Sequence, residues 1–142
     1  MKKLLFLCTG NYYRSRFAEH LFNHLAPKQG LDWKADSRGL ALERGVNNVG
    51  PISPYTIAFL GELGLTVSES ERFPLQATDA DFASADRIIA LDESEHRPLM
   101  GDRYPQWSAK VEYWLVHDVE ITPATTALPE IDQRIRQLVT QL

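Results

Sequence analysis

The hydrophobic pattern changes period within the first 25 residues, and this change limits the fold more than any other feature of the sequence. Leu4 to Cys8 is a continuous apolar run of the kind that forms a buried strand. From Arg14 onward, apolar residues such as Phe17 and Leu21 recur at the spacing of one helix face. The sequence therefore predicts a strand that leads into a helix through a short turn, residues 9–13.

The same alternation continues to the end of the chain. Three more apolar runs have the length of strands: Trp33–Ser37, Arg87–Leu91 and Val111–Val116. Residues that favour helix starts lie between or after these runs: Ser53 with Pro54, Thr78 with Asp81, Asp92, and Pro129 with Glu130. Strands that alternate with helices predict one α/β domain, residues 1–142, in which helices cover both faces of a parallel sheet.

Composition argues against several classes of protein. A net charge of −4 disfavours nucleic acid as the main partner. The single cysteine, Cys8, cannot form an intramolecular disulfide. The first apolar run is shorter than the ~7–15 residues of a signal-peptide core, and no run approaches the ~18 residues of a membrane span. We expect a cytoplasmic protein that binds neither nucleic acid nor membrane.

Four polar residues fall at or just after the carboxyl ends of the predicted strands: Cys8, Ser37, Asp92 and Asp118. In open parallel sheets, ligands bind beyond these strand ends. The positions of these four residues therefore indicate one common ligand-binding site.

The first turn has the chemistry of an anion site. A loop that wraps from a strand into a helix turns successive backbone N–H groups toward its centre. Gly10 permits close approach of the backbone, and Asn11 tolerates the left-handed conformation that such loops use. Arg14 adds a planar donor that suits two phosphate oxygens. We expect the backbone of residues 9–14 to surround a phosphate.

Cys8 lies at the base of this turn, where the groups that bind an oxyanion also stabilise a thiolate and lower the pKa of the thiol. A thiolate that faces a bound phosphate is a nucleophile for phosphoryl transfer, and Ser15 is placed to hydrogen-bond the sulfur. The alternative is a buried structural cysteine with a surface arginine. The combination of cysteine, glycine, asparagine, arginine and serine at one strand–helix junction favours the functional interpretation.

These residues resemble a known family. The segment "CTGNYYRSRFAEHLF", residues 8–22, is similar to the phosphate-binding loop of the low-molecular-weight protein tyrosine phosphatases, whose signature is C-x5-R-S near the N-terminus. Three later segments resemble that family in the same order: "ADSRGL" (35–40), "FPLQATDADF" (73–82) and "ADRIIALDESE" (85–95). The resemblance implies a four-stranded parallel sheet of order 2-1-3-4 in a three-layer α/β/α fold.

The resemblance also implies a function: hydrolysis of phosphotyrosine-like aryl phosphates through a phosphocysteine intermediate, with no cofactor and no metal. Cys8 would be the nucleophile and Arg14 the phosphate clamp, and Asn11, Ser15 and Ser37 would form the network that holds the loop. The phosphate-binding residues would be Thr9, Gly10, Asn11, Tyr12, Tyr13, Arg14 and Ser15. The implied partners are a tyrosine-phosphorylated protein or a small aryl phosphate, with inorganic phosphate or other oxyanions as ligands.

The general acid is the point at which this sequence departs most from the family. A phosphate monoester needs a proton donor for its leaving oxygen, which the family supplies from an Asp-Pro pair after the fourth strand. This chain has no Asp-Pro pair. Asp118 stands at the corresponding place but is followed by Val119, and His117 and Glu120 are the alternative donors.

Two tyrosines mark further departures from the family. Tyr13 stands where many members have a second cysteine, and Tyr12 could form part of an aromatic wall for a substrate ring. Ordinary packing around the loop is the other explanation for both.

Three functions other than a phosphatase are alternatives for a loop of this kind. An arsenate reductase of this fold would need an external thiol, because the chain has one cysteine. A phosphocysteine carrier is disfavoured by Arg14, Ser15 and a candidate acid, which would hasten hydrolysis. A phosphate- or phosphotyrosine-binding module with weakened catalysis is the last alternative.

Overall fold

A computed structural model describes all 142 residues. Its centre is a four-stranded parallel sheet with the order β2-β1-β3-β4. The strands are β1 (Lys2–Cys8), β2 (Trp33–Gly39), β3 (Arg87–Ala90) and β4 (Val111–Tyr113). The predicted sheet, its parallel pairing and its strand order are confirmed.

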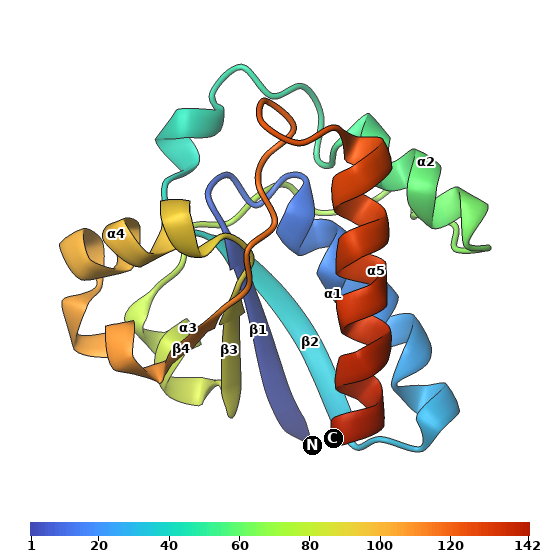
Figure 1. Cartoon of the computed structure of the whole chain (residues 1–142), viewed down its shortest axis with the longest axis horizontal. Coiled ribbons are helices and arrows are strands. Elements are labelled where there is room, and N and C mark those ends of the chain that lie inside the picture. Colours follow the sequence, from blue (N-terminus) through green and yellow to red (C-terminus); the bar gives the residue numbers. More distant parts are fainter.

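Helices cover both faces of the sheet (Figure 1). On one face lie α1 (Arg14–Leu25), α2 (Pro54–Glu62) and α5 (Ala124–Gln141), and on the other lie α3 (Asp79–Ser84) and α4 (Glu93–Arg103). Three short 3-10 helices complete the structure: η1 (Pro27–Gln29), η2 (Leu42–Gly45) and η3 (Pro105–Lys110).

The side chains of β1 alternate between two hydrophobic cores. Leu4 and Phe6 belong to the core beneath α1 and α5, where they join Phe17 and Ile131. Leu5 and Leu7 belong to the second core, beneath α3 and α4. A strand that is buried on both faces needs apolar residues at every position, which explains the continuous run that the sequence shows.

The register places Cys8 at the edge of the sheet where the ligand is expected. Cys8 pairs with Gly39 of β2, and Leu7 pairs with Ala90 of β3. The parallel strands beside β1 therefore end at the same level as Cys8, and the loops that follow them surround the turn between β1 and α1 (Figure 1).

Most predicted helix starts agree with the structure. The Ser53 side chain accepts a hydrogen bond from the backbone of Tyr55 at 3.2 Å, and Thr78 and Asp81 form a capping box. Asp92 caps α4 through the backbone N–H of Ser94. These side chains satisfy N–H groups that the first turn of a helix leaves free.

Strands β1, β2 and β3 differ from the prediction by one or two residues at one end, and two other boundaries differ by more. The fourth strand ends at Tyr113 rather than Val116, because Leu115 makes an isolated antiparallel bridge to Asp92 and the chain leaves the sheet there. The last helix begins at Ala124, not at Pro129, and Pro129 lies inside it. The turn before Pro129 buries Ala127 and Leu128 in the core, and this burial offsets the backbone hydrogen bond that proline cannot make.

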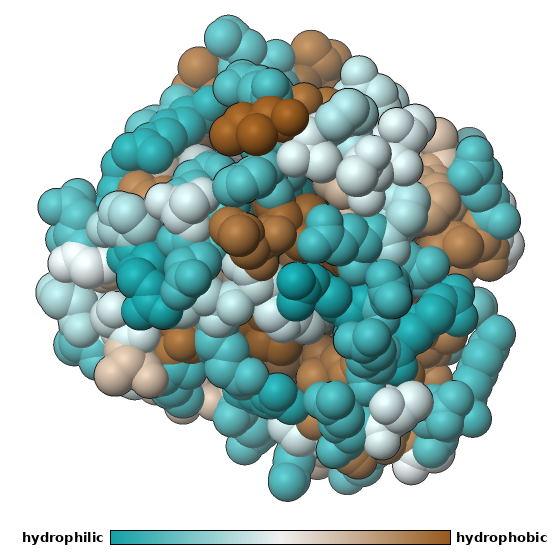
Figure 2. Space-filling model, in the orientation of Figure 1, coloured by the Kyte–Doolittle hydropathy of each residue, from teal (hydrophilic) through white to brown (hydrophobic).

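The outer surface is mainly polar. Figure 2 shows hydrophilic residues over most of one face, with hydrophobic residues in separate patches between them. None of the helices has the length and apolar character that crossing a membrane requires.

Candidate active site

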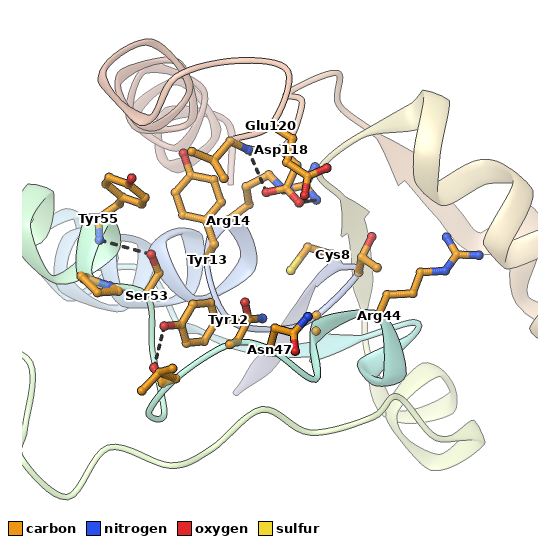
Figure 3. Close-up of a pocket in the computed structure, with 17 residues that line it drawn as sticks. Cys8, Tyr12, Tyr13, Arg14, Arg44, Asn47, Ser53, Tyr55, Asp118 and Glu120 are labelled. Atoms are coloured by element: carbon orange, nitrogen blue, oxygen red, sulfur yellow. Dashed lines mark hydrogen bonds and ion pairs between the residues drawn. The ribbon is translucent and has the colours of Figure 1, made fainter.

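The turn between β1 and α1 forms the floor of a cavity of about 420 Å³. The floor consists of Cys8, Thr9, Gly10 and Arg14. Tyr12, Tyr13 and Tyr55 stand on one side of it, and Asp118 and Glu120 project from the loop after β4 (Figure 3). Arg44, Asn47 and Asn48 contribute the remaining rim.

The backbone of the turn has the conformation that the sequence predicts. Asn11 has a φ of 51°, and it is the one residue other than glycine with a positive φ. Asparagine adopts this left-handed conformation more readily than most residues because its short polar side chain bonds locally. Helix α1 starts at Arg14, so the N–H groups of its first turn, which have no partner within the helix, lie at the cavity floor.

A chain of hydrogen bonds joins Cys8 to the second strand. The Cys8 thiol is buried, and its Sγ lies 2.9 Å from the hydroxyl oxygen of Ser15. The Asn11 amide donates to Ser15 Oγ and to Ser37 Oγ, each at 2.9 Å. The structure thus brings Cys8, Asn11, Ser15 and Ser37 together, although Ser37 is 29 residues from the cysteine in sequence.

Arg14 is buried among carboxylates. Its Nη1 donates to the carbonyl of Val116 at 3.0 Å and lies 3.5 Å from Asp92 Oδ2. Its Nη2 lies 3.4 Å from Glu95 Oε2 and 3.9 Å from Asp118 Oδ2. Burial alone would lower the pKa of Arg14, but the neighbouring Cys8 and the three carboxylates raise it. Its Nε is buried without a hydrogen-bond partner, so one donor of the guanidinium is free for a ligand.

The three candidate acids lie in different surroundings. Asp118 lines the cavity, is 41% exposed, and accepts a hydrogen bond from the backbone of Val119 at 2.8 Å. Glu120 also lines the cavity. His117 does not, because its Nδ1 lies 2.9 Å from Asp92 Oδ2 and the ring is bound to that buried carboxylate.

Arg72 holds the back of the turn, and the sequence prediction missed it. Its Nη1 donates to Asn11 Oδ1 at 2.9 Å, and its Nη2 donates to the carbonyl of Ser37 at 2.9 Å. Burial is the largest cause that lowers the pKa of Arg72, and the nearby Glu19 opposes it. Arg72 lies 61 residues after Asn11 in a segment without regular structure, so no periodicity or spacing points to it.

Arg16 is a second cation behind the turn. Its side chain is fully buried, and its Nη2 donates to Glu71 Oε1 at 2.6 Å. Its Nη1 donates to the carbonyl of Pro51 at 2.8 Å. The sequence prediction did not include this role of Arg16.

The first turn of α4 contacts the front of the loop. The Asp92 N–H donates to Nδ1 of His96 at 3.0 Å, so the ring proton is on Nε2, which lies 3.1 Å from Thr9 Oγ1. The Thr9 hydroxyl in turn donates to Glu95. Burial, reinforced by the charge of Arg14, lowers the pKa of His96 to about 3, so the ring is neutral. The sequence prediction missed these contacts as well.

A phosphate-sized anion suits this arrangement better than a metal ion does. No group of three or more histidine, cysteine, aspartate or glutamate side chains is arranged to hold a metal. The floor instead offers backbone N–H groups, a buried guanidinium and a thiol. Cationic and N–H donors around a thiol bind an oxyanion and present it to a nucleophile.

Comparison with known proteins agrees with this geometry. The family model described as "Low molecular weight phosphotyrosine protein phosphatase" matches residues 3–142. The pig (Sus scrofa) low molecular weight phosphotyrosine protein phosphatase is 34% identical over 116 residues, which cover 78% of this chain and 69% of that protein. The human enzyme is 34% identical over 100 residues, covering 69% of this chain and 60% of that protein.

Two further comparisons widen the range of similar proteins. A protein-arginine-phosphatase of Bacillus subtilis is 28% identical over 108 residues, which cover 76% of this chain and 67% of that protein. Among solved structures, the low molecular weight protein tyrosine phosphatase of T. tengcongensis superposes with a TM-score of 0.81 at 26% identity, and all of both chains is covered.

Proposed function

The chain belongs to the low molecular weight phosphotyrosine protein phosphatase family, and from this we propose that it hydrolyses phosphotyrosine-like aryl phosphate monoesters through a phosphocysteine intermediate. One observation carries the proposal: the Cys8 thiol forms the floor of a cavity whose walls supply an arginine, a carboxylic acid and aromatic side chains. We further propose that residues 1–142 form a single catalytic domain, since the family match runs from residue 3 to residue 142.

The phosphoryl group binds to the turn between β1 and α1. The N–H groups of residues 9–14 donate to its oxygens, and Arg14 clamps it through Nε, which has no protein partner, and Nη2. Inorganic phosphate and other tetrahedral oxyanions are ligands of the same loop. Bidentate contacts of this kind orient the phosphorus above Cys8.

Phosphoryl transfer then proceeds in two steps. The Cys8 thiolate attacks phosphorus, the bond to the leaving oxygen breaks, and Asp118 gives that oxygen a proton. Asp118, now a carboxylate, takes a proton from a water molecule that attacks the phosphocysteine. The S–P bond breaks, inorganic phosphate forms, and the Ser15 hydroxyl stabilises the departing thiolate from 2.9 Å.

Asp118 is the acid that the geometry favours. It lies at the cavity within 3.9 Å of the phosphate clamp Arg14, whereas His117 is bound to Asp92.

The lining of the cavity supports an aryl substrate. Tyr12 is fixed by a hydrogen bond from its hydroxyl to the carbonyl of Val49 at 2.6 Å, and its ring lines the cavity with Tyr13 and Tyr55.

The proposal is tested with two aryl phosphates that differ in leaving group. We expect Asp118→Asn to lower kcat/KM for a phosphotyrosine peptide by about 10²–10⁴-fold, and to lower it less for p-nitrophenyl phosphate, whose leaving group needs no proton. Glu120→Gln is the matched control and should leave both substrates near the wild-type rate.

Other outcomes would identify the alternatives. If Asp118→Asn leaves both rates and their pH dependence unchanged, Asp118 is not the acid. If the wild type binds phosphotyrosine without turnover, the protein is a binding module. A phosphoarginine peptide is included because one similar protein is a protein-arginine-phosphatase; a higher kcat/KM on that peptide than on phosphotyrosine would overturn the aryl substrate class.

A further inference from the structure

Glu95 does not line the cavity itself, but it contacts two residues that do. It lies in the first turn of α4, and its Oε2 is 3.4 Å from Nη2 of Arg14. Its other carboxylate oxygen, Oε1, accepts the hydroxyl proton of Thr9. One carboxylate therefore contacts two residues of the turn that forms the cavity floor, Thr9 and Arg14.

The hydrogen bonds around Thr9 fix the direction of that contact. Nδ1 of His96 accepts the Asp92 N–H, so Nε2 of His96 carries the proton and donates to Thr9 Oγ1. The single hydroxyl proton of Thr9 is then left for Glu95. A neutral, buried histidine thus orients Thr9 toward a negatively charged acceptor.

The donors of Arg14 show why this contact affects ligand binding. Nη1 is taken by the Val116 carbonyl and by Asp92. Only Nε and Nη2 remain for two phosphate oxygens, and Nη2 already faces Glu95. A phosphate dianion on these two donors would lie beside the Glu95 carboxylate, and like charges at such separations repel strongly in a partly buried site.

We propose that Glu95 is a built-in competitor for the phosphate site: together with Asp92 and Asp118 it balances the charge of Arg14 while the site is empty, and an incoming phosphate must displace it from Nη2. This inference rests on the proposed function, because it concerns the same loop. Its consequence is weaker retention of inorganic phosphate, the product of the reaction. Glu95 acts on the ligand through Arg14 and Thr9, and it is a positioning residue rather than a catalytic one.

The test measures the binding of inorganic phosphate, without turnover, to the wild type and to Glu95→Gln. Glutamine has the same shape and still accepts from Thr9, but it has no charge. We expect it to bind phosphate about tenfold more tightly, since one unit charge is removed a few ångströms from a dianion. Product inhibition of aryl phosphate hydrolysis should strengthen by the same factor.

Glu93→Gln is the matched control. Glu93 lies on the same helix, is 49% exposed, and pairs with Arg97 rather than with the loop. We expect wild-type phosphate affinity from this variant. Equal or weaker phosphate binding by Glu95→Gln than by Glu93→Gln would overturn the proposal.

A structure of the wild type with bound phosphate gives a second test that needs no variant. The Glu95 carboxylate is expected to have turned away from Nη2 of Arg14, and a phosphate on Nη2 with the Glu95 contact intact would contradict the proposal. If phosphate binds as expected but aryl phosphates are not hydrolysed, the proposed function fails while the inference about Glu95 stands.

Discussion

At the scale of single residues, the site depends on side chains whose hydrogen bonds hold Cys8 and Arg14 in place. Ser15 contacts the thiol, Asn11 joins Ser15 to Ser37, and Arg72 secures Asn11 from behind. The resemblance to the family implied that Asn11, Ser15 and Ser37 form this network. It could not predict Arg72, whose place depends on the path of a long irregular segment.

Tyr13 allows a residue-scale prediction about stability. Its ring is buried, its hydroxyl has no hydrogen-bond partner, and burial, reinforced by the charge of Asp118, raises the pKa of the phenol to about 12. Because an unsatisfied buried hydroxyl costs free energy, Tyr13→Phe should raise the free energy of unfolding by about 1 kcal/mol. Urea denaturation measures this. Tyr55→Phe, at an exposed ring, should leave stability unchanged, and destabilisation by Tyr13→Phe would show that the hydroxyl has a partner.

At the scale of elements, the first turn of α4 makes two sets of contacts. Asp92 caps the helix, and residues of the same turn also contact the loop between β1 and α1. The sequence predicted Asp92 as the cap, and the structure confirms it. The sequence placed Asp92 at the same edge of the sheet as the turn, but it did not show the contact of Asp92 with Arg14, or that Glu95 and His96 reach Thr9. These contacts depend on the register between β3 and β1, which places the start of α4 beside the turn.

The buried His96 makes the stability of the fold depend on pH. Its pKa is about 3 in the folded protein, against 6.5 for an unperturbed histidine. Between these values the unfolded chain binds a proton that the folded chain does not, so stability falls as the pH drops below 6.5, by about 1.4 kcal/mol per pH unit. Denaturation at pH 7 and pH 5 should show a smaller loss for His96→Gln than for the wild type. Equal losses in the two proteins would rule out His96 as a source of the pH dependence.

At the scale of the whole molecule, α/β topology was the most predictable property. Alternating strand and helix patterns indicated the parallel sheet, and the resemblance to a family gave its order. The extent of α5 was not predictable from local signals, because burial of Ala127 and Leu128 outweighs the cost of Pro129 inside the helix. The sequence also did not predict the conformation of the irregular segments before α2 and α3. In the structure, the buried Arg16 donates hydrogen bonds to a carbonyl in each segment, that of Pro51 and that of Arg72.

Arg16 therefore allows a prediction at this largest scale. Replacing it by methionine leaves Glu71, which is 12% exposed, without its arginine partner. Removal of one member of a buried ion pair typically costs about 3–5 kcal/mol of stability. The double variant Arg16→Met with Glu71→Gln should lose less than the sum of the two single variants, because the two residues interact directly. If the losses of the two single variants add up to that of the double variant, Arg16 and Glu71 have no interaction free energy.

The central claim is that the Cys8 thiol takes the phosphoryl group from the substrate. Rapid acid quenching during turnover of an aryl phosphate, followed by mass spectrometry of the peptides, tests it most directly. With p-nitrophenyl phosphate, whose leaving group needs no proton, phosphate is expected on the Cys8 Sγ in the wild type and in greater amount in Asp118→Ala, because that variant still forms the intermediate but lacks the base for its hydrolysis. Cys8→Ser should show neither turnover nor a phosphorylated intermediate on the substrate's time scale. Turnover that persists in Cys8→Ser at the wild-type rate would contradict the account.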